Sequence, residues 1–221
     1  MAKNKDTQGV LQPRAVVVGP QVSRVSIDIN KRHKAVRVGF HPGGLYRLLG
    51  IPMKEMVDES FNAEDIFGSR IAQLNEQLQE AASFDAIFQL TEQFLLERVS
   101  TLKPSLSFDL AMLKLLSEGG ICTVETLASF ACVSLRQFER ISHDRIGFSP
   151  KFFSRIARFS RAYRMREKHP DRRWTDIAHA CAYFDQMHMI RDFKQFTGAS
   201  PFAIEQELRS TALRLQAELN L

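Results

Sequence analysis

Positive charge is concentrated in one stretch of the chain, residues 134–173. This stretch holds twelve Lys and Arg against four Asp and Glu, a net charge of +8, whereas the whole chain of 221 residues carries +5. The remaining residues therefore sum to −3. Because guanidinium and ammonium groups gathered in this way attract polyanions, the stretch indicates a surface for nucleic acid on a slightly acidic body.

The apolar residues inside this stretch recur at helical spacing. Phe152, Ile156, Phe159 and Tyr163 stand at i, i+4, i+7 and i+11. One face of a helix can therefore pack while its other faces stay charged. The positions between them carry Arg155, Arg158 and Arg161.

A helix-turn-helix pattern comes just before the basic helix. Thr123 is a suitable N-cap for a helix over residues 124–130, and Ser134 is one for a helix in which Phe138 and Ile141 point inward. Residues 131–133 between them fit a tight turn. Two short helices joined by a turn of three or four residues are what this motif requires.

The same pattern occurs again 51 residues later. Both copies share an N-cap, an inward apolar residue four positions on and a Gly-x-Ser-Pro exit, and the basic helix that begins after Ser149-Pro150 connects them. The matched pairs are Ser134/Asp185, Phe138/Met189, Arg140/Arg191, Gly147/Gly198, Ser149/Ser200 and Pro150/Pro201.

Residues 106–208 resemble the DNA-binding domain of the AraC/XylS family of bacterial transcription regulators. The second copy carries the resemblance in Trp174-Thr175-Asp176-Ile177-Ala178, in Ala182-Tyr183-Phe184-Asp185-Gln186 and in Arg191-Asp192-Phe193-Lys194-Gln195-Phe196-Thr197-Gly198-Ala199-Ser200-Pro201. The first copy adds Ser134-Leu135-Arg136-Gln137-Phe138-Glu139-Arg140 and Gly147-Phe148-Ser149-Pro150-Lys151.

Three residues depart from the family pattern. Ala182 stands where the family usually has Gly in the turn, Met189 where it often has Phe, and Ser142 where the first core usually takes Phe. We expect Ala182 to adopt a left-handed backbone that costs free energy, and Ser142 to make the first unit less stable.

In a helix-turn-helix the second helix enters the major groove, and its outward residues touch base edges. Their side chains suit base recognition, since Arg matches guanine, Gln matches adenine, Glu accepts from cytosine and Met meets a thymine methyl. The predicted base-reading residues are Arg136, Gln137, Glu139 and Arg140 in the first unit and Gln186, Met187, His188 and Arg191 in the second. The predicted phosphate contacts are Ser134, Lys151, Arg155, Arg158, Asp185 and Lys194.

The first half of the chain has a different pattern, in which short β-rich runs precede the helices. After a leader over residues 1–12, short β-rich runs at residues 15–18, 24–29 and 35–40 predict antiparallel strands. Helices are expected over residues 45–50, 66–80 and, capped by Ser83, 84–99. The predicted fold is α+β, with short antiparallel strands and helices in a sensing or dimerisation domain, residues 13–103. An all-α domain of two helix-turn-helix units joined by a linker helix follows, residues 104–221.

Residues 41–50 more loosely resemble the end of the small β-barrel that precedes the helices in one branch of the same family. Relatives have more barrel strands upstream than this chain can hold. We therefore expect either an abbreviated barrel or a sheet that a second copy completes.

Composition restricts the remaining possibilities. Three cysteines without a C-x-x-C spacing suggest neither a disulfide framework nor a zinc site, and no run of about 18 apolar residues suggests a membrane span. We expect a cytoplasmic protein with no cofactor, no metal and no membrane partner. The expected partners are double-stranded DNA and, implied by the resemblance, RNA polymerase, a small-molecule effector and a second copy bound through the N-terminal domain.

Two alternatives remain beside a sequence-specific transcription regulator. A nonspecific architectural DNA-binding protein would keep the basic helix but show no sequence preference. A cupin-like metal enzyme would use His33 and His41, but the clustered ligands of such a site are absent, as are a Gly-rich phosphate loop, a G-x-S-x-G elbow and an H-E-x-x-H pattern. The sequence therefore predicts a protein that is not an enzyme.

Overall fold

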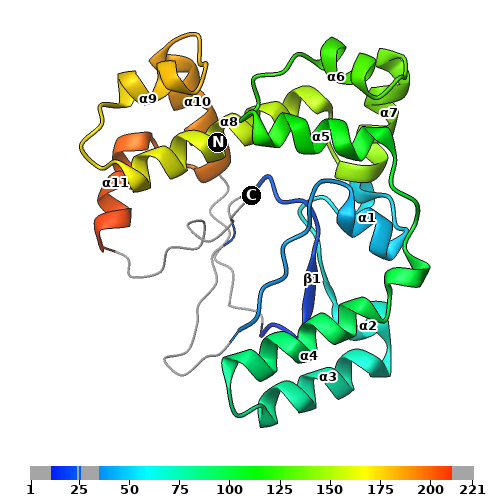
Figure 1. The fold of residues 1–221 in the computed structure, drawn as a ribbon. Coiled ribbons are helices and arrows are strands. Elements are labelled where there is room, and N and C mark those ends of the chain that lie inside the picture. The colour runs from blue at the N-terminus through cyan, green and yellow to red at the C-terminus, as the bar shows by residue number, and fades with distance from the viewer. Residues whose placement is uncertain (1–10, 24, 26–34, 211–221) are drawn as a thin grey trace.

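The computed structural model describes residues 11–23, 25 and 35–210. Within them the fold is α+β, as predicted: a small antiparallel sheet and several helices come first, and an all-helical region follows (Figure 1). Helices α9 and α10 lie at one end of α8, helices α5 to α7 lie at its other end, and α3 and α4 pack side by side away from both (Figure 1).

The N-terminal sheet has two described strands. Strand β1 (Val16–Val18) pairs antiparallel with β2 (Ser60–Asn62), with Val17 opposite Phe61. The strand predicted at residues 15–18 is thus confirmed, although its partner comes from a segment in which we predicted no strand.

The third predicted strand is wrong. Residues 35–40 are exposed and form no strand, because no described segment pairs with them in a hydrogen-bonded ladder. The second predicted strand, residues 24–29, lies almost wholly outside the described residues.

Helices follow the strands in the first half. The predicted helix over residues 66–80 is divided at Gly68, whose φ of +65° no α-helix accepts, and the N-cap predicted at Ser83 accepts a hydrogen bond from the Ala86 amide at 3.1 Å. The helical elements are α1 (Gly44–Leu49), η1 (Met53–Glu55), α2 (Ala63–Phe67), α3 (Ser69–Glu80), α4 (Phe84–Leu96) and η2 (Val99–Thr101).

The second half is entirely helical up to Ser210. Thr123, Ser134, Ser149 and Asp185 cap their helices as predicted, each accepting a hydrogen bond from a backbone amide in the first turn. The helices are α5 (Ser107–Ser117), α6 (Val124–Phe130), α7 (Leu135–Ile146), α8 (Pro150–Lys168), α9 (Trp174–Ala180), α10 (Gln186–Thr197) and α11 (Pro201–Ser210).

The internal repeat is wider in the structure than in the sequence. Phe108 of α5 and Phe159 of α8 stand 51 residues apart, and their rings pack at 4.8 Å against Phe138 and Phe193 respectively. Ala111 and Ala162, at the same offset, are both fully buried. The second half of α8 therefore belongs to the second unit, as α5 belongs to the first, and it also connects the two units.

Each unit has its own core. The first is built from α5, α6 and α7 around Phe108, Met112, Leu115 and Phe138, and the second from α8, α9 and α10 around Phe159, Ile177, Met189 and Phe193. Met189, which departs from the family pattern, is completely buried. Packing of these faces fixes how each unit presents its second helix.

Ser142 is buried in the first core at the place where the second core has Phe193. Its hydroxyl donates a hydrogen bond to the Phe148 carbonyl at 2.7 Å. A buried hydroxyl with a partner costs little, but it fills less apolar volume than a phenyl ring. The expectation that the first unit is the less stable one stays a prediction.

Candidate nucleic-acid interface

Helix α7 presents its predicted base-reading residues to solvent. Phe138 is buried and Ile141 packs against the first core, so the opposite face of α7 is turned outward. All four residues predicted to read bases in this unit are exposed: Arg136, Gln137, Glu139 and Arg140.

Helix α10 repeats this arrangement in the second unit. Met189 and Phe193 are fully buried, which leaves the outward face free. Its four predicted base-reading residues are exposed as well: Gln186, Met187, His188 and Arg191. Met187 is a large apolar side chain that is 57% exposed at the start of α10, so it is accessible to a binding partner.

His188 is tied to the helix cap. Its amide and its ring Nδ1 both bond to the Asp185 carboxylate, at 2.7 and 2.8 Å. The two contacts, the amide first, hold the pKa of Asp185 below its usual value. The carboxylate is therefore committed to capping α10, so that any phosphate contact near it would come from the helix amides.

The two turns have the same geometry. Cys132 in the first and Ala182 in the second both have a φ of +55°, as expected for Ala182 and not foreseen for Cys132. In each turn the next amide donates a hydrogen bond back to the helix before the turn, Val133 to the Ala128 carbonyl of α6 at 3.1 Å and Tyr183 to the Ala178 carbonyl of α9 at 3.0 Å. The left-handed residue thus sets the angle at which the second helix leaves the turn.

The predicted phosphate residues divide into two groups. Lys151 and Lys194 are exposed, and Ser134 is exposed at its helix cap. Arg155 and Arg158 are half-buried and engaged within the protein, a role that sequence reasoning did not foresee.

Arg155 joins α8 to α10. Its guanidinium bonds to buried Asp192 through Nε at 3.0 Å and Nη2 at 2.7 Å, and to Gln195 at 2.5 Å. It also lies 5.6 Å from the ring centroids of Phe152 and Phe196.

Arg158 packs over the Tyr183 ring at 5.4 Å. Burial, with the Asp192 carboxylate nearby, raises the pKa of Tyr183 well above its usual value, so this phenol stays neutral. The arginine therefore lies against an apolar, uncharged surface, and its stem contributes to packing as well as to charge.

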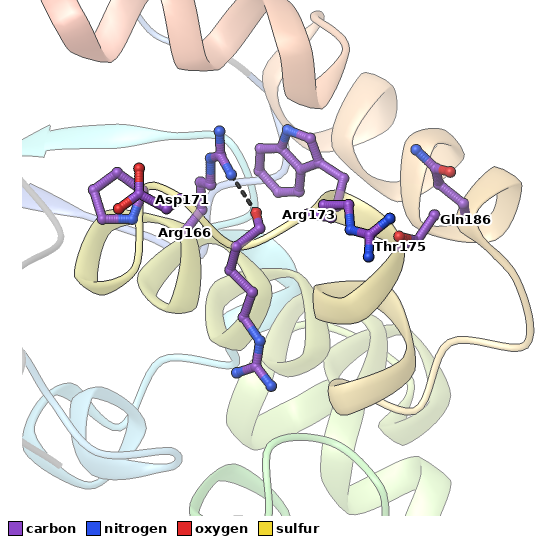
Figure 2. A pocket seen from close by; sticks show the side chains of 8 residues that line it. Arg166, Asp171, Arg173, Thr175 and Gln186 are labelled. Atoms are coloured by element: carbon purple, nitrogen blue, oxygen red, sulfur yellow. Dashed lines mark hydrogen bonds between the residues drawn. The ribbon is translucent and has the colours of Figure 1, made fainter.

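A cavity of about 390 Å³ adds basic residues that sequence reasoning missed. Arg172, Arg173 and Thr175 line it together with Gln186, a predicted base reader (Figure 2). Arg166, on the same cavity, is held by Glu205 and by the Arg172 carbonyl. The repeat could have found this place, since Arg173 corresponds to the N-cap Thr123 of the first unit.

No three His, Cys, Asp or Glu side chains gather as a metal site within the described part of the chain. His41 is exposed there, and His33 lies outside the described residues. Among the helices that the structure describes, none is long and apolar enough to cross a bilayer.

Two helix-turn-helix units, each with an exposed second helix and joined by one basic helix, define a DNA-binding protein of the transcription-regulator class. A family model described as "Helix-turn-helix domain" matches residues 127–206. This match spans both turns and both second helices, α7 and α10, of the two units.

The comparison with solved structures includes the DNA-binding domain of AdpA, described as the global transcriptional factor, in complex with a target DNA. It is 25% identical, with a TM-score of 0.45, over 48% of this chain and 96% of that one. No curated protein matches this chain significantly.

Proposed function

We propose that this regulator reads its operator with two recognition helices, α7 and α10, in successive major grooves. Each unit inserts the outward face of its second helix, and α8 sets the distance between the two units. A single chain would then recognise the two half-sites that many regulators read as dimers.

The observation that carries the proposal is the matched exposure of the two helices. Eight polar or methionine side chains face solvent on two helices whose opposite faces are buried in separate cores. A surface helix that only meets water needs nothing more than charged side chains on such a face. Helices α7 and α10 instead carry the side-chain types that match base edges, and each follows a backbone turn of the same geometry.

The length of α8 fits this geometry. Its 19 residues give a helix of about 28 Å. Successive major grooves on one face of B-DNA lie about 34 Å apart. The α7 and α10 helices project from cores at either end of α8, so they can span one helical turn of DNA (Figure 1).

Exposed cations supply the nonspecific share of binding. Lys151 at the start of α8 and Lys194 on α10 are exposed and can meet phosphates, as are Arg172 and Arg173, which line one cavity with Gln186. These contacts fix register without reading sequence. Arg155 and Arg158, by contrast, add charge to the surface while holding the second unit together.

Selection of binding sites from random duplexes tests the proposal. We expect an enriched site with two conserved elements centred about 10 base pairs apart, bound by one chain. A single element of about five base pairs would contradict the two-groove reading. No enrichment at all would instead favour the nonspecific architectural alternative.

Binding of an effector, of RNA polymerase and of a second copy stays a prediction. The role of residues 13–103 as a sensing or dimerisation domain stays a prediction too. Whether transcription rises or falls would follow from where the selected site lies in a promoter.

A further inference from the structure

Residues 41–57, which we call the docking segment, lie against the first helix-turn-helix unit (Figure 1). Met53 and Met56 are almost completely buried. Gly147, which ends α7, faces the docking segment so closely that an added Cβ would stand 3.0 Å from Val57 Cγ2 and 3.1 Å from the Met53 carbonyl oxygen. The docking segment therefore has a fixed position relative to α7.

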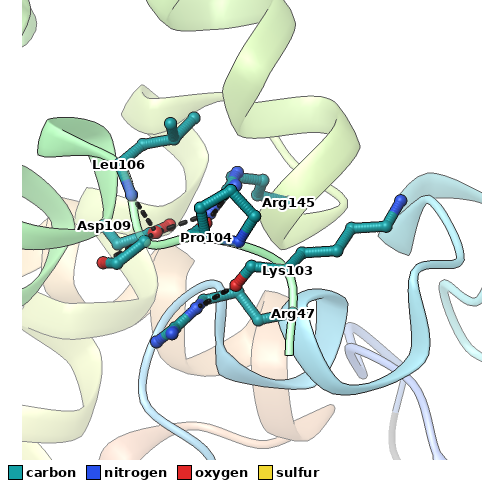
Figure 3. Close-up of polar contacts among 7 residues, drawn as sticks. Arg47, Lys103, Pro104, Leu106, Asp109 and Arg145 are labelled. Atoms are coloured by element: carbon teal, nitrogen blue, oxygen red, sulfur yellow. Dashed lines mark hydrogen bonds and ion pairs between the residues drawn. The ribbon is translucent and has the colours of Figure 1, made fainter. Parts of the chain in front are cut away.

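Polar contacts hold the same junction. The Arg47 side chain donates to the Lys103 carbonyl at 2.8 Å, and the Lys103 amide donates to the Arg47 carbonyl at 2.9 Å (Figure 3). Arg145 of α7 bonds to the Pro104 carbonyl at 3.0 Å and to buried Asp109. Since the Arg145 guanidinium also lies 4.9 Å from the Tyr46 ring centroid, α1, residues 103–104 and α7 form one packed unit.

At the outer edge of this junction, η1 contributes a lysine to α7. Lys54 Nζ donates to Asp144 Oδ1 at 2.9 Å, and this hydrogen bond raises the pKa of Lys54. The other oxygen of the same carboxylate, Oδ2, stands 3.9 Å from Nη1 of Arg140, one turn earlier on α7. Arg140 is 69% exposed and is one of the proposed base readers.

The second unit has the same arrangement with other residues. Gln195 occupies the place of Asp144, one turn after Arg191, as Asp144 follows Arg140. The Gln195 side-chain oxygen Oε1 accepts a hydrogen bond from Arg155 of α8 at 2.5 Å. In both units, a cation from a neighbouring element thus occupies the acceptor that stands one turn after the proposed base-reading arginine.

We propose that Lys54 is a specificity-determining residue that acts through Asp144: it takes the closer contact with this carboxylate, and so weakens the pull of the carboxylate on the Arg140 guanidinium, which can then reach a base edge. The inference rests on the proposed base-reading role of α7. A residue of the first half of the chain thereby sets how strongly the first unit discriminates between sequences.

The physical reason is competition for one acceptor. An aspartate four residues after an arginine on the same helix attracts it. With Lys54 in place, the carboxylate is neutralised by a better-positioned donor. Without it, Asp144 attracts Arg140 along the helix surface and adds an uncompensated negative charge near DNA phosphates.

The test compares Lys54→Met, Asp144→Asn and the double variant, titrated against a selected duplex and a scrambled one at two salt concentrations. Methionine keeps an apolar stem and removes only the ammonium group. For an exposed ion pair we expect Lys54→Met to reduce the ratio of the two affinities by about two- to five-fold. The double variant should discriminate as well as Asp144→Asn alone, because no carboxylate remains to capture Arg140.

The matched control is Lys114→Met, which removes another exposed lysine paired with an acidic residue, Glu118, at 2.5 Å, but on α5. It should leave the affinity ratio unchanged. Arg140→Ala reports on the proposed function separately: if it leaves the ratio unchanged, α7 does not read a base through Arg140, and the base-reading proposal fails for that residue whatever Lys54 does.

Two results would overturn the role of Lys54 while leaving the proposed function standing. An equal loss on both duplexes, with the salt slope lowered by about one, would make Lys54 a phosphate contact. A loss of discrimination that Asp144→Asn fails to restore would mean that Lys54 acts by another route.

Discussion

Arg155 of α8 and Asp192 of α10 form an ion pair in which two guanidinium nitrogens, at 3.0 and 2.7 Å, bond to one carboxylate oxygen. The Asp192 side chain is only 7% exposed and that of Arg155 is 29% exposed. The pair joins α8, the helix between the two units, to α10, which we propose to read DNA. The positive charge of Arg155 therefore stabilises the packing of these two helices.

Replacing Arg155 by Ala should destabilise the protein by about 2–4 kcal/mol, because it leaves a buried carboxylate without its partner. Urea unfolding followed by circular dichroism measures this change. Lys151→Ala, an exposed residue of the same helix, is the control and should stay within about 0.5 kcal/mol of the parent protein. A similarly small effect of Arg155→Ala would show that the pair contributes little.

Arg140→Ala should cost roughly 1–3 kcal/mol on a selected duplex and relax the preference at one base pair. Lys151→Ala should instead weaken binding to all sequences alike and lower the salt slope by about one. Titrations against matched and scrambled duplexes at two salt concentrations separate the two effects. Equal losses on both duplexes for Arg140→Ala would contradict its base-reading role.

Arg173→Ala should reduce affinity on matched and scrambled duplexes by the same factor and lower the salt slope by about one, because Arg173 lies beside Gln186 and is 85% exposed. Arg70→Ala, on α3, is the control, since it removes an equally charged residue far from both recognition helices. A loss confined to the matched duplex would instead make Arg173 a base reader.

Ala182→Gly should stabilise the protein by about 0.5–1 kcal/mol. Glycine removes the roughly 1–2 kcal/mol that a left-handed alanine costs in the folded state. Its greater conformational freedom in the unfolded chain offsets only part of this gain. Cys132→Gly tests the same position of the first unit. Ala180→Gly, within α9, is the matched control and should destabilise by up to about 1 kcal/mol. Thermal and urea unfolding should agree; a loss of stability in Ala182→Gly would contradict the backbone argument.

The three thiols should react with an alkylating reagent in a fixed order. Cys132 is exposed and should be modified first. Burial raises the pKa of Cys181, and burial together with Glu118 raises that of Cys122, so both hold less thiolate near pH 8 and react more slowly. Timed labelling read by mass spectrometry checks the order, and rapid modification of Cys181 in the folded protein would contradict it.

Sequence reasoning succeeded where the structure depends on local pattern. The caps at Ser134 and Asp185, the glycines that end α7 and α10 with φ of +91° and +73°, and the inward positions Phe138 and Met189 were all predicted correctly. Each is set by residues within one or two turns, where spacing and side-chain type are sufficient.

Sequence reasoning failed where the residues that contact each other lie far apart in the chain. The strand at residues 60–62 is too short to show alternation, and it exists because β1 supplies its hydrogen bonds across more than forty positions. In the same way, sequence reasoning did not foresee that Arg155, a predicted phosphate contact, also bonds to Asp192. Its position between Asp192 and two phenyl rings is visible only once α8 and α10 are packed.

By itself, the sequence determined the double helix-turn-helix and which helix faces are turned outward, because periodicity and capping encode them locally. Only the tertiary structure decided that α8 belongs to the second core and that Lys54 meets Asp144. The reason is physical: a contact between residues 90 positions apart depends on how whole elements pack, and an isolated lysine carries no pattern that points to its partner.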